Sequence, residues 1–313
     1  EHNERTRNSA EKRNRQKDKY ERTQSRHKNQ RGYKGRPRES LSQGYLINVM
    51  NKKIPFEFLY QFFSLIIAII MVHAIYLGII RPTASAILED REVQMLADPA
   101  FVPERSFYVV VKDFEQEACF ILMFWAISLM LYKARQNINE RRVLQMNLIS
   151  SSEETSILPQ DTREYARPIE ALSEHSQDSL IARALTTALH RFRSTENIQD
   201  VSNSILSVCD AESERLDSEL SMIRYIAWAI PSIGFLGTVR GIGQALGQAH
   251  QAVGGEITAV TQSLGVAFNS TFVALLISIL IMFLMHQLQL AQERLTQEVQ
   301  SYCDNKLVSH LKT

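Results

Sequence analysis

Cysteine is scarce in this sequence and follows no pattern. The three cysteines, Cys119, Cys209 and Cys303, lie far apart along the 313 residues. None has a neighbour at the spacing of a metal-ligand or redox motif. We interpret them as packing residues and predict no metal site.

The sequence also lacks the motifs of enzymes. It contains no Walker segment, nucleophile elbow, HExxH sequence or paired-carboxylate constellation. Gly241-Ile242-Gly243 does not complete a dinucleotide fingerprint, and Asn269-Ser270-Thr271 matches a glycosylation sequon inside a predicted membrane helix. We therefore predict no catalytic residue and no cofactor. An apolar h-region near the start is missing too, so no cleavable signal peptide is visible.

Charge is absent from long stretches, although the whole chain carries 35 basic and 34 acidic residues. Such segregation is typical of a chain that contacts both water and lipid. The uncharged runs are 58–80, 118–132, 225–239 and 257–292. A helix over the first run spans roughly 34 Å, enough for a hydrocarbon core of about 30 Å. We predict an all-α membrane protein. His73, inside the first run, receives no role, because a lone histidine there is more often packed or interfacial.

The second run is short, at roughly 22 Å of helix, and its assignment depends on topology. Basic residues precede the first run and return after the second, at Lys133 and Arg135. Basic flanks favour the cytoplasmic side, so the chain must cross an even number of times between them. The acid-rich residues 81–115 suit the outer side. We predict four transmembrane helices, with both termini in the cytoplasm.

Composition divides the chain into five parts. They are a basic, disordered cytoplasmic arm (1–53), transmembrane helices one and two with a short outer loop (54–135), a cytoplasmic helical region (136–222), transmembrane helices three and four (223–290) and a cytoplasmic helical tail (291–313).

The basic arm cannot bury a core, because it is poor in aliphatic residues and lacks periodicity. We interpret it as a solvated tail that fixes membrane orientation. Binding to anionic lipid, at about 1 kcal/mol per basic residue, and binding to nucleic acid are the alternatives.

Apolar stripes run along the helices predicted outside the membrane. Ile181, Leu185, Leu189 and Phe192 have helical spacing. They could dock a cytoplasmic partner or pack against one another and against neighbouring copies. The last helix should continue past the bilayer, because Leu288, Leu295 and Tyr302 recur every seven residues along an amphipathic tail.

Small residues mark the third and fourth transmembrane helices. Gly237 and Gly241 form a small-xxx-small pair, which lets helix backbones approach closely. Ala267, Thr271, Ala274 and Ser278 share one face of the fourth helix. The hydroxyls on these helices could hydrogen-bond water or a carboxylate inside a bundle, or bond back to the carbonyl one turn earlier.

Two segments carry a family resemblance: PSIGFLGTVRGI at 231–242 and LGVAFNSTFVAL at 264–275. Together they resemble the paired signature of the MotA/TolQ/ExbB family, over roughly residues 165–300. The four-span layout is similar to the flagellar-stator branch of that family. The resemblance implies a bacterial inner-membrane ring, a pentamer, around two copies of a single-span partner of the ExbD/TolR/MotB type that carries an essential aspartate.

The resemblance also implies roles for individual residues. Thr238 and Thr271 match the threonines that face the central pore, and Ala267, Ala274 and Ser278 join them as expected pore-lining residues. Helix packing is assigned to Pro231, Gly234, Gly237 and Gly241. The function implied is a proton channel subunit, or a sodium channel subunit, of an ion-driven motor.

Three positions depart from the family pattern or receive no role. Val266 stands where several relatives have a glutamate, so no subunit-borne carboxylate is predicted. Arg240 stands where Trp or Leu is expected, and it could repel cations or pair with an acid. Asn269 receives no role. The alternative function is a non-conducting oligomeric scaffold that recruits cytoplasmic partners.

Overall fold

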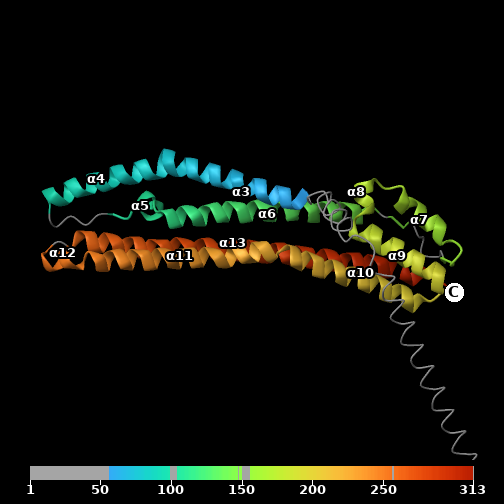
Figure 1. The fold of residues 1–313 in the computed structure, drawn as a ribbon. Helices are drawn as coiled ribbons and strands as arrows, with labels where there is room; N and C mark the ends of the chain where they lie inside the picture. Colours follow the sequence, from blue (N-terminus) through green and yellow to red (C-terminus); the bar gives the residue numbers. More distant parts are fainter. Residues whose placement is uncertain (1–55, 99–103, 147, 150–155, 256, 313) are drawn as a thin grey trace, which may run out of the picture. The chain divides into compact units, whose positions relative to one another are not determined.

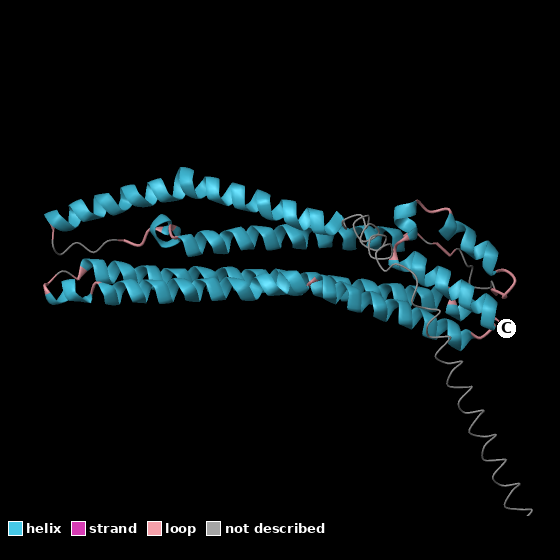
Figure 2. Ribbon diagram, viewed as in Figure 1, coloured by secondary structure: helices cyan, strands magenta, loops and turns pink. Residues whose placement is uncertain are grey.

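The computed structural model describes residues 56–98, 104–146, 148–149, 156–255 and 257–312. The basic arm at 1–53, with its lipid and nucleic-acid alternatives, lies outside the described residues. Every regular element in the described ranges is a helix (Figure 2), as predicted. One isolated bridge, between Ile157 and Leu311, joins two extended residues.

The first long helix is built from α3 (Phe56–Ile75), the π-helical η1 (Tyr76–Ile80) and α4 (Arg81–Ala97). It outlasts the uncharged run at 58–80. The outer connection that we expected to be a short loop is therefore largely helical, with α5 (Phe107–Val111) following. Pro82 lies just after the π-helical turn. A wider turn relieves the clash that a proline ring makes with the carbonyl four residues earlier, so the helix can continue.

A stripe at every fourth position of this helix is buried. Its members are Ser64, Ala68, Val72, Tyr76, Ile80 and Ala84. In a regular α-helix such a stripe drifts by about 40° per step. The π-helical turn carries more residues per turn, which lessens the drift. One face of the helix thus stays against α6 (Phe114–Leu144), where Tyr60 bonds to Ser128 and the Trp125 indole donates to the carbonyl of Gln61 at 3.0 Å.

Helices α11 (Ser221–Gly247) and α13 (Thr258–Lys306) form an antiparallel pair, connected through the short α12 (Ala249–Val253). Figure 1 shows them side by side along their length, with α6 against them. Helix α13 is 49 residues long. That is roughly 73 Å, more than twice the hydrocarbon thickness of about 30 Å, so it continues beyond any bilayer as predicted.

Within the described residues, four helices are long and apolar enough to cross a membrane, which agrees with the predicted number of spans. They are Glu57–Met95, Phe114–Leu144, Ile198–Gly247 and Thr258–His310. The parts suited to hydrocarbon are the uncharged runs within them. Many large apolar side chains on these helices are exposed, such as Ile67, Phe235 and Phe283. Such a surface suits lipid or a partner helix and not water, so the protein is a multi-pass membrane protein.

One hydrophobic core joins α3, α6, α11 and α13. A second core lies around the C-terminal ends of α6 and α13. The helices around it are α7 (Thr162–Glu170), α8 (Glu174–Gln177), α9 (Leu180–Thr195), α10 (Ile198–Glu219) and η2 (Val308–His310). Helix α9 begins after Ser179, whose hydroxyl accepts from the amide of Ala182, and ends at Glu196 in the left-handed conformation, with φ 52°.

The stripe on α9 belongs to this second core. Ile181, Leu185, Leu189 and Phe192 are all at most 2% exposed. They pack with residues of the α13 tail, including Leu295 and Val299. Of the two interpretations left open by the sequence, packing is the one that the structure supports, because a buried stripe offers no docking surface.

Candidate functional site

Glycines line the contact between α11 and α13. A Cβ atom on Gly237 would lie 2.5 Å from the Cβ of Ser270, and one on Gly241 would lie 2.7 Å from the backbone nitrogen of Ala267. A Cβ on Gly234 would overlap that of Ala274. Real Cβ atoms do not approach so closely, so these three glycines let the two backbones meet.

Pro231 leaves a carbonyl without its helical partner, and Ser278 supplies one. Proline has no N–H, so the carbonyl four residues earlier, at Ala227, loses its usual donor. The hydroxyl of Ser278, on α13, donates to that carbonyl at 3.0 Å in a buried position. The proline in α11 is thus accommodated by a side chain of the neighbouring helix, as buried backbone groups in lipid require.

Thr238 and Thr271 meet where α11 and α13 come together. The hydroxyl of Thr238 lies 3.1 Å from the carbonyl oxygen of Ala267 and touches the hydroxyl of Thr271. The hydroxyl of Thr271 donates to the carbonyl of Gly234 at 3.2 Å. The hydroxyl of Thr238 also lies 3.3 Å from the carbonyl oxygen of Gly234, one turn earlier in the same helix. Both threonines bond across the two helices, and both are half-buried.

The other three residues expected to line the pore are buried within the chain. Ala267 and Ala274 are 0% exposed, and Ser278 is 5% exposed. Their neighbours on α11 include Gly241, Gly234 and the carbonyl of Ala227. Within a single chain they therefore hold the two helices together, whereas the threonines lie at the edge of the contact.

A groove of about 640 Å³ opens beside Thr271, between α13 and the segment around α5. Phe268, Phe272, Leu275 and Val110 supply its apolar lining, and Asn269 and Arg105 are among its polar lining residues. Asn269, which received no role from the sequence, therefore lines the same groove as Thr271.

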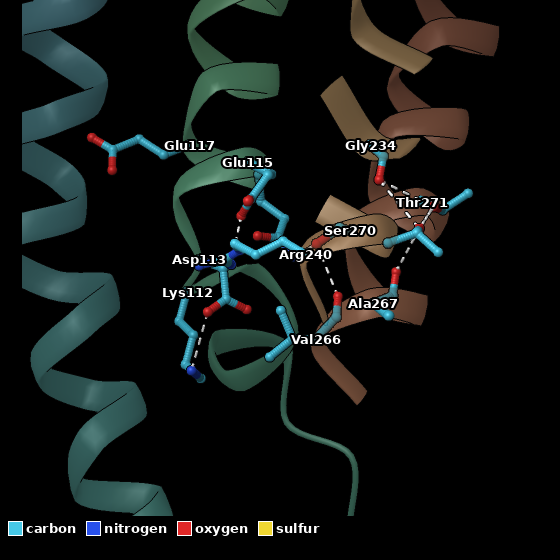
Figure 3. A network of polar contacts seen from close by, with 12 residues as sticks. Lys112, Asp113, Glu115, Glu117, Gly234, Arg240, Val266, Ala267, Ser270 and Thr271 are labelled. Carbon is cyan, nitrogen blue, oxygen red and sulfur yellow. Dashed lines mark hydrogen bonds and ion pairs between the residues drawn. The ribbon is translucent and has the colours of Figure 1, made fainter. Parts of the chain in front are cut away.

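The first turn of α6 brings carboxylates that the sequence analysis did not assign to the site. Arg240 Nη2 lies 2.7 Å from Glu115 Oε2, so Arg240 pairs with an acid. The side-chain amide of Gln116 donates to the hydroxyl of Ser270 at 3.3 Å. Figure 3 shows Glu115 and Arg240 close to Ser270, which directly precedes Thr271 on α13.

Glu117 points to the other side of α6, toward the first long helix. Its two carboxylate oxygens lie 2.6 Å from His73 Nδ1 and 2.5 Å from Arg81 Nη2. His73 is therefore a polar contact of a buried acid. The available signal was the acidic cluster just before the uncharged run at 118–132, but nothing in the sequence pairs those acids with partners that lie 36 to 125 positions away.

A polar cavity of about 280 Å³ lies where α6 reaches α9 and α10. Lys133 Nζ is 2.8 Å from Glu219 Oε2 beside it. Asn137 and Gln292 also line it, and their side-chain oxygens have no hydrogen-bond partner among the described residues. No three His, Cys, Asp or Glu side chains gather as metal ligands within the described ranges.

Two carboxylates at this cavity, both outside the uncharged runs, have shifted pKa values. Burial raises the pKa of Glu140, although the amide of Leu180 donates to it at 2.9 Å. Burial also acts on Glu212, but hydrogen bonds from Arg215 and Arg183 outweigh it and lower the pKa of this carboxyl. Arg215 Nη2 and Arg183 Nη2 each lie 2.6 Å from Glu212.

The chain matches a family of membrane proteins over part of its length. No curated protein matches the chain. Residues 174–301 match the sequence model of the MotA/TolQ/ExbB proton channel family. The matched segment runs from α8 through α11 into the tail of α13, so it contains the threonine pair and the glycine contact, whereas the α6 side of the polar cavity lies outside it. The match supports membership of this chain in the MotA/TolQ/ExbB proton channel family.

Proposed function

We propose that this chain is the channel subunit of an ion-motive-force-driven motor, and that protons, or sodium ions, pass beside Thr238 and Thr271. The observation that carries the proposal is the threonine pair itself. Its two hydroxyls lie half-buried at the edge of the α11–α13 contact, inside the segment that matches a proton channel family.

Charge on the two helices supports a partner. Between Tyr225 and Gln292 the sequence has only Arg240 and Glu256 as charged residues. The uncharged runs of α11 and α13 offer no titratable carrier of their own, and Glu115 of α6 is paired with Arg240, so we assign the carrier to a second protein. A single-span ExbD/TolR/MotB-like protein with an aspartate would supply it.

The proposed pore lies between copies of the chain. Because Ala267, Ala274 and Ser278 are covered by α11, we assign them to a rigid helical hairpin and leave Thr238 and Thr271 to face the pore. A ring of such hairpins, five in the family architecture, would surround the partner. In this arrangement the α12 end lies at the outer face of the bacterial inner membrane, and both termini lie in the cytoplasm.

Energy for the motor would come from the membrane potential. Moving one charge through about 100 mV releases roughly 2.3 kcal/mol. Reversible protonation of the partner's aspartate beside the threonine hydroxyls would couple that release to relative rotation of ring and partner, which transmits mechanical work across the envelope.

The test is Thr271→Val in the chain expressed with its single-span partner. Valine keeps the shape of threonine and removes the hydroxyl, so we expect ion flux to fall by about tenfold or more. Thr261→Val is the matched control. In the described structure its hydroxyl bonds to the carbonyls of Ile257 and Thr258, at the start of the same helix, and the variant should leave flux unchanged.

Flux at the full level in Thr271→Val, with normal expression, would show that the pore assignment is wrong. A complex that assembles fully and conducts no ions in any variant would favour the scaffold, in which the glycine contact serves packing alone.

A further inference from the structure

Arg240 is a problem for a cation path, because it is the only charged residue on α11 between Tyr225 and Gly247. It stands two residues after Thr238. Its side chain is 38% exposed, and a guanidinium stays positive at every accessible pH. A bare positive charge at this position would oppose any cation that approaches the threonine pair.

Glu115 reaches Arg240 from another helix. The carboxylate belongs to the first turn of α6, after Asp113, and its Oε2 lies 2.7 Å from Arg240 Nη2. The Glu115 side chain is only 14% exposed. An ion pair with one mostly buried partner is screened by salt less than a fully exposed pair, and it depends on both members being present.

Gly237 makes room for this carboxylate. A Cβ atom on Gly237 would lie 3.1 Å from Cγ of Glu115, so the acid's stem crosses α11 at the glycine and meets Arg240 one turn further on. The neighbouring Gln116 is 0% exposed and bonds to Ser270 Oγ. The first turn of α6 is thus seated against both α11 and α13, at the level of Ser270, the residue before Thr271 (Figure 3).

We infer that Glu115 is a residue of the ion path whose role is to neutralise Arg240 next to the threonine pair, so that a cation can approach. This inference rests on the proposed function. Glu115 is a positioning and selectivity residue of the channel subunit. It does not carry the transported proton, because its carboxylate is held by the guanidinium.

Glu117 provides a matched comparison two residues along. It is also a glutamate and also ion-paired, yet its partners are Arg81 and His73 on the first long helix. No charge on α11 depends on it in the described structure. Replacing Glu117 changes the same charge in the same turn of the membrane helix without exposing Arg240.

The experiment measures proton flux into vesicles that contain the chain with its single-span partner, at matched amounts of assembled complex. Glu115→Gln should reduce flux by about tenfold or more, because Arg240 is left unpaired. The double variant Glu115→Gln with Arg240→Gln, which removes both charges, should recover flux to within about threefold of wild type. Glu117→Gln should retain flux.

Either of two results overturns the inference while leaving the proposed function intact. One is full flux in Glu115→Gln. The other is a double variant that assembles and stays as inactive as Glu115→Gln, because neutralisation of Arg240 would then not be the role of Glu115. Absence of flux from the wild-type complex is a different failure, since it contradicts the proposed function itself.

Discussion

Ser278 shows how one hydroxyl can serve a membrane helix that contains a proline. In the bilayer no water is available to the carbonyl of Ala227, which Pro231 leaves without its helical donor. We therefore expect Ser278→Ala to destabilise the assembled protein by about 1–3 kcal/mol, the penalty of a buried acceptor left unsatisfied. The measurement is the thermal unfolding midpoint of the purified complex in detergent.

Ser232→Ala is the control for that measurement. Ser232 is exposed on α11, and its hydroxyl bonds to the carbonyl of Trp228 in its own helix. Its loss should leave the midpoint within the error of the measurement. An unchanged midpoint in Ser278→Ala would contradict the role given to this hydroxyl and would return Ser278 to the list of pore-lining candidates.

At the residue scale, sequence patterns located the contact but not its partners. The spacing of Gly237 and Gly241 predicts a close helix approach, and the structure places α13 there. Nothing in the spacing indicates that Ser278 donates to Ala227, because that bond depends on the register of two helices. The same limit hid the pair between Glu115 and Arg240, whose members are 125 positions apart.

At the scale of elements, one buried acid joins α9 to α10. Arg183 on α9 and Arg215 on α10 both bond to Glu212. Their hydrogen bonds hold its pKa below the unfolded value of about 4.3. Stability from Glu212 is therefore fully present above that value and is lost as the pH falls through the folded pKa.

We expect Glu212→Gln to lower stability at pH 7 by about 1–3 kcal/mol, because the three charge-assisted hydrogen bonds from Arg183 and Arg215 are weakened. The variant should also lose part of the acid destabilisation that we expect in wild type. Unfolding midpoints of the purified protein at pH 7.5 and at pH 4 would measure both effects.

Glu140 gives the opposite expectation in the same cavity. Burial raises the pKa of Glu140 in the folded protein, so the charged carboxylate lowers stability at neutral pH. That loss of stability becomes smaller as the pH falls through the folded pKa toward the lower pKa of the unfolded chain. Glu140→Gln keeps an acceptor for the amide of Leu180 and should not destabilise the protein at pH 7.5. If Glu140→Gln and Glu212→Gln lowered the unfolding midpoint equally at neutral pH, the roles given to these two carboxylates would be wrong.

The elements themselves were largely predictable, because long uncharged runs and apolar stripes are strong signals. The exceptions lie around Pro82 and the acidic residues 81–97, where charge suggested a loop. The π-helical turn before Pro82 lets the helix continue, and a local backbone adjustment of this kind leaves no mark in a hydrophobicity pattern.

At the scale of the whole molecule, the described helices pack into two separate hydrophobic cores. One joins α3, α6, α11 and α13 along the apolar runs, and the other joins α9, α10 and the tail of α13. Helix α13 belongs to both. A movement of the threonine pair would therefore be transmitted along one continuous helix to the second core, which is the connection that a motor subunit requires.

The central claim is that ions cross the membrane through this chain with a partner, and proton uptake into vesicles tests it most directly. The chain is reconstituted with its single-span partner, and wild type is compared with a partner whose membrane aspartate is changed to asparagine. Our account predicts uptake that is driven by the membrane potential and lost with the aspartate. No uptake from a fully assembled wild-type complex, or uptake that persists without the aspartate, would contradict it.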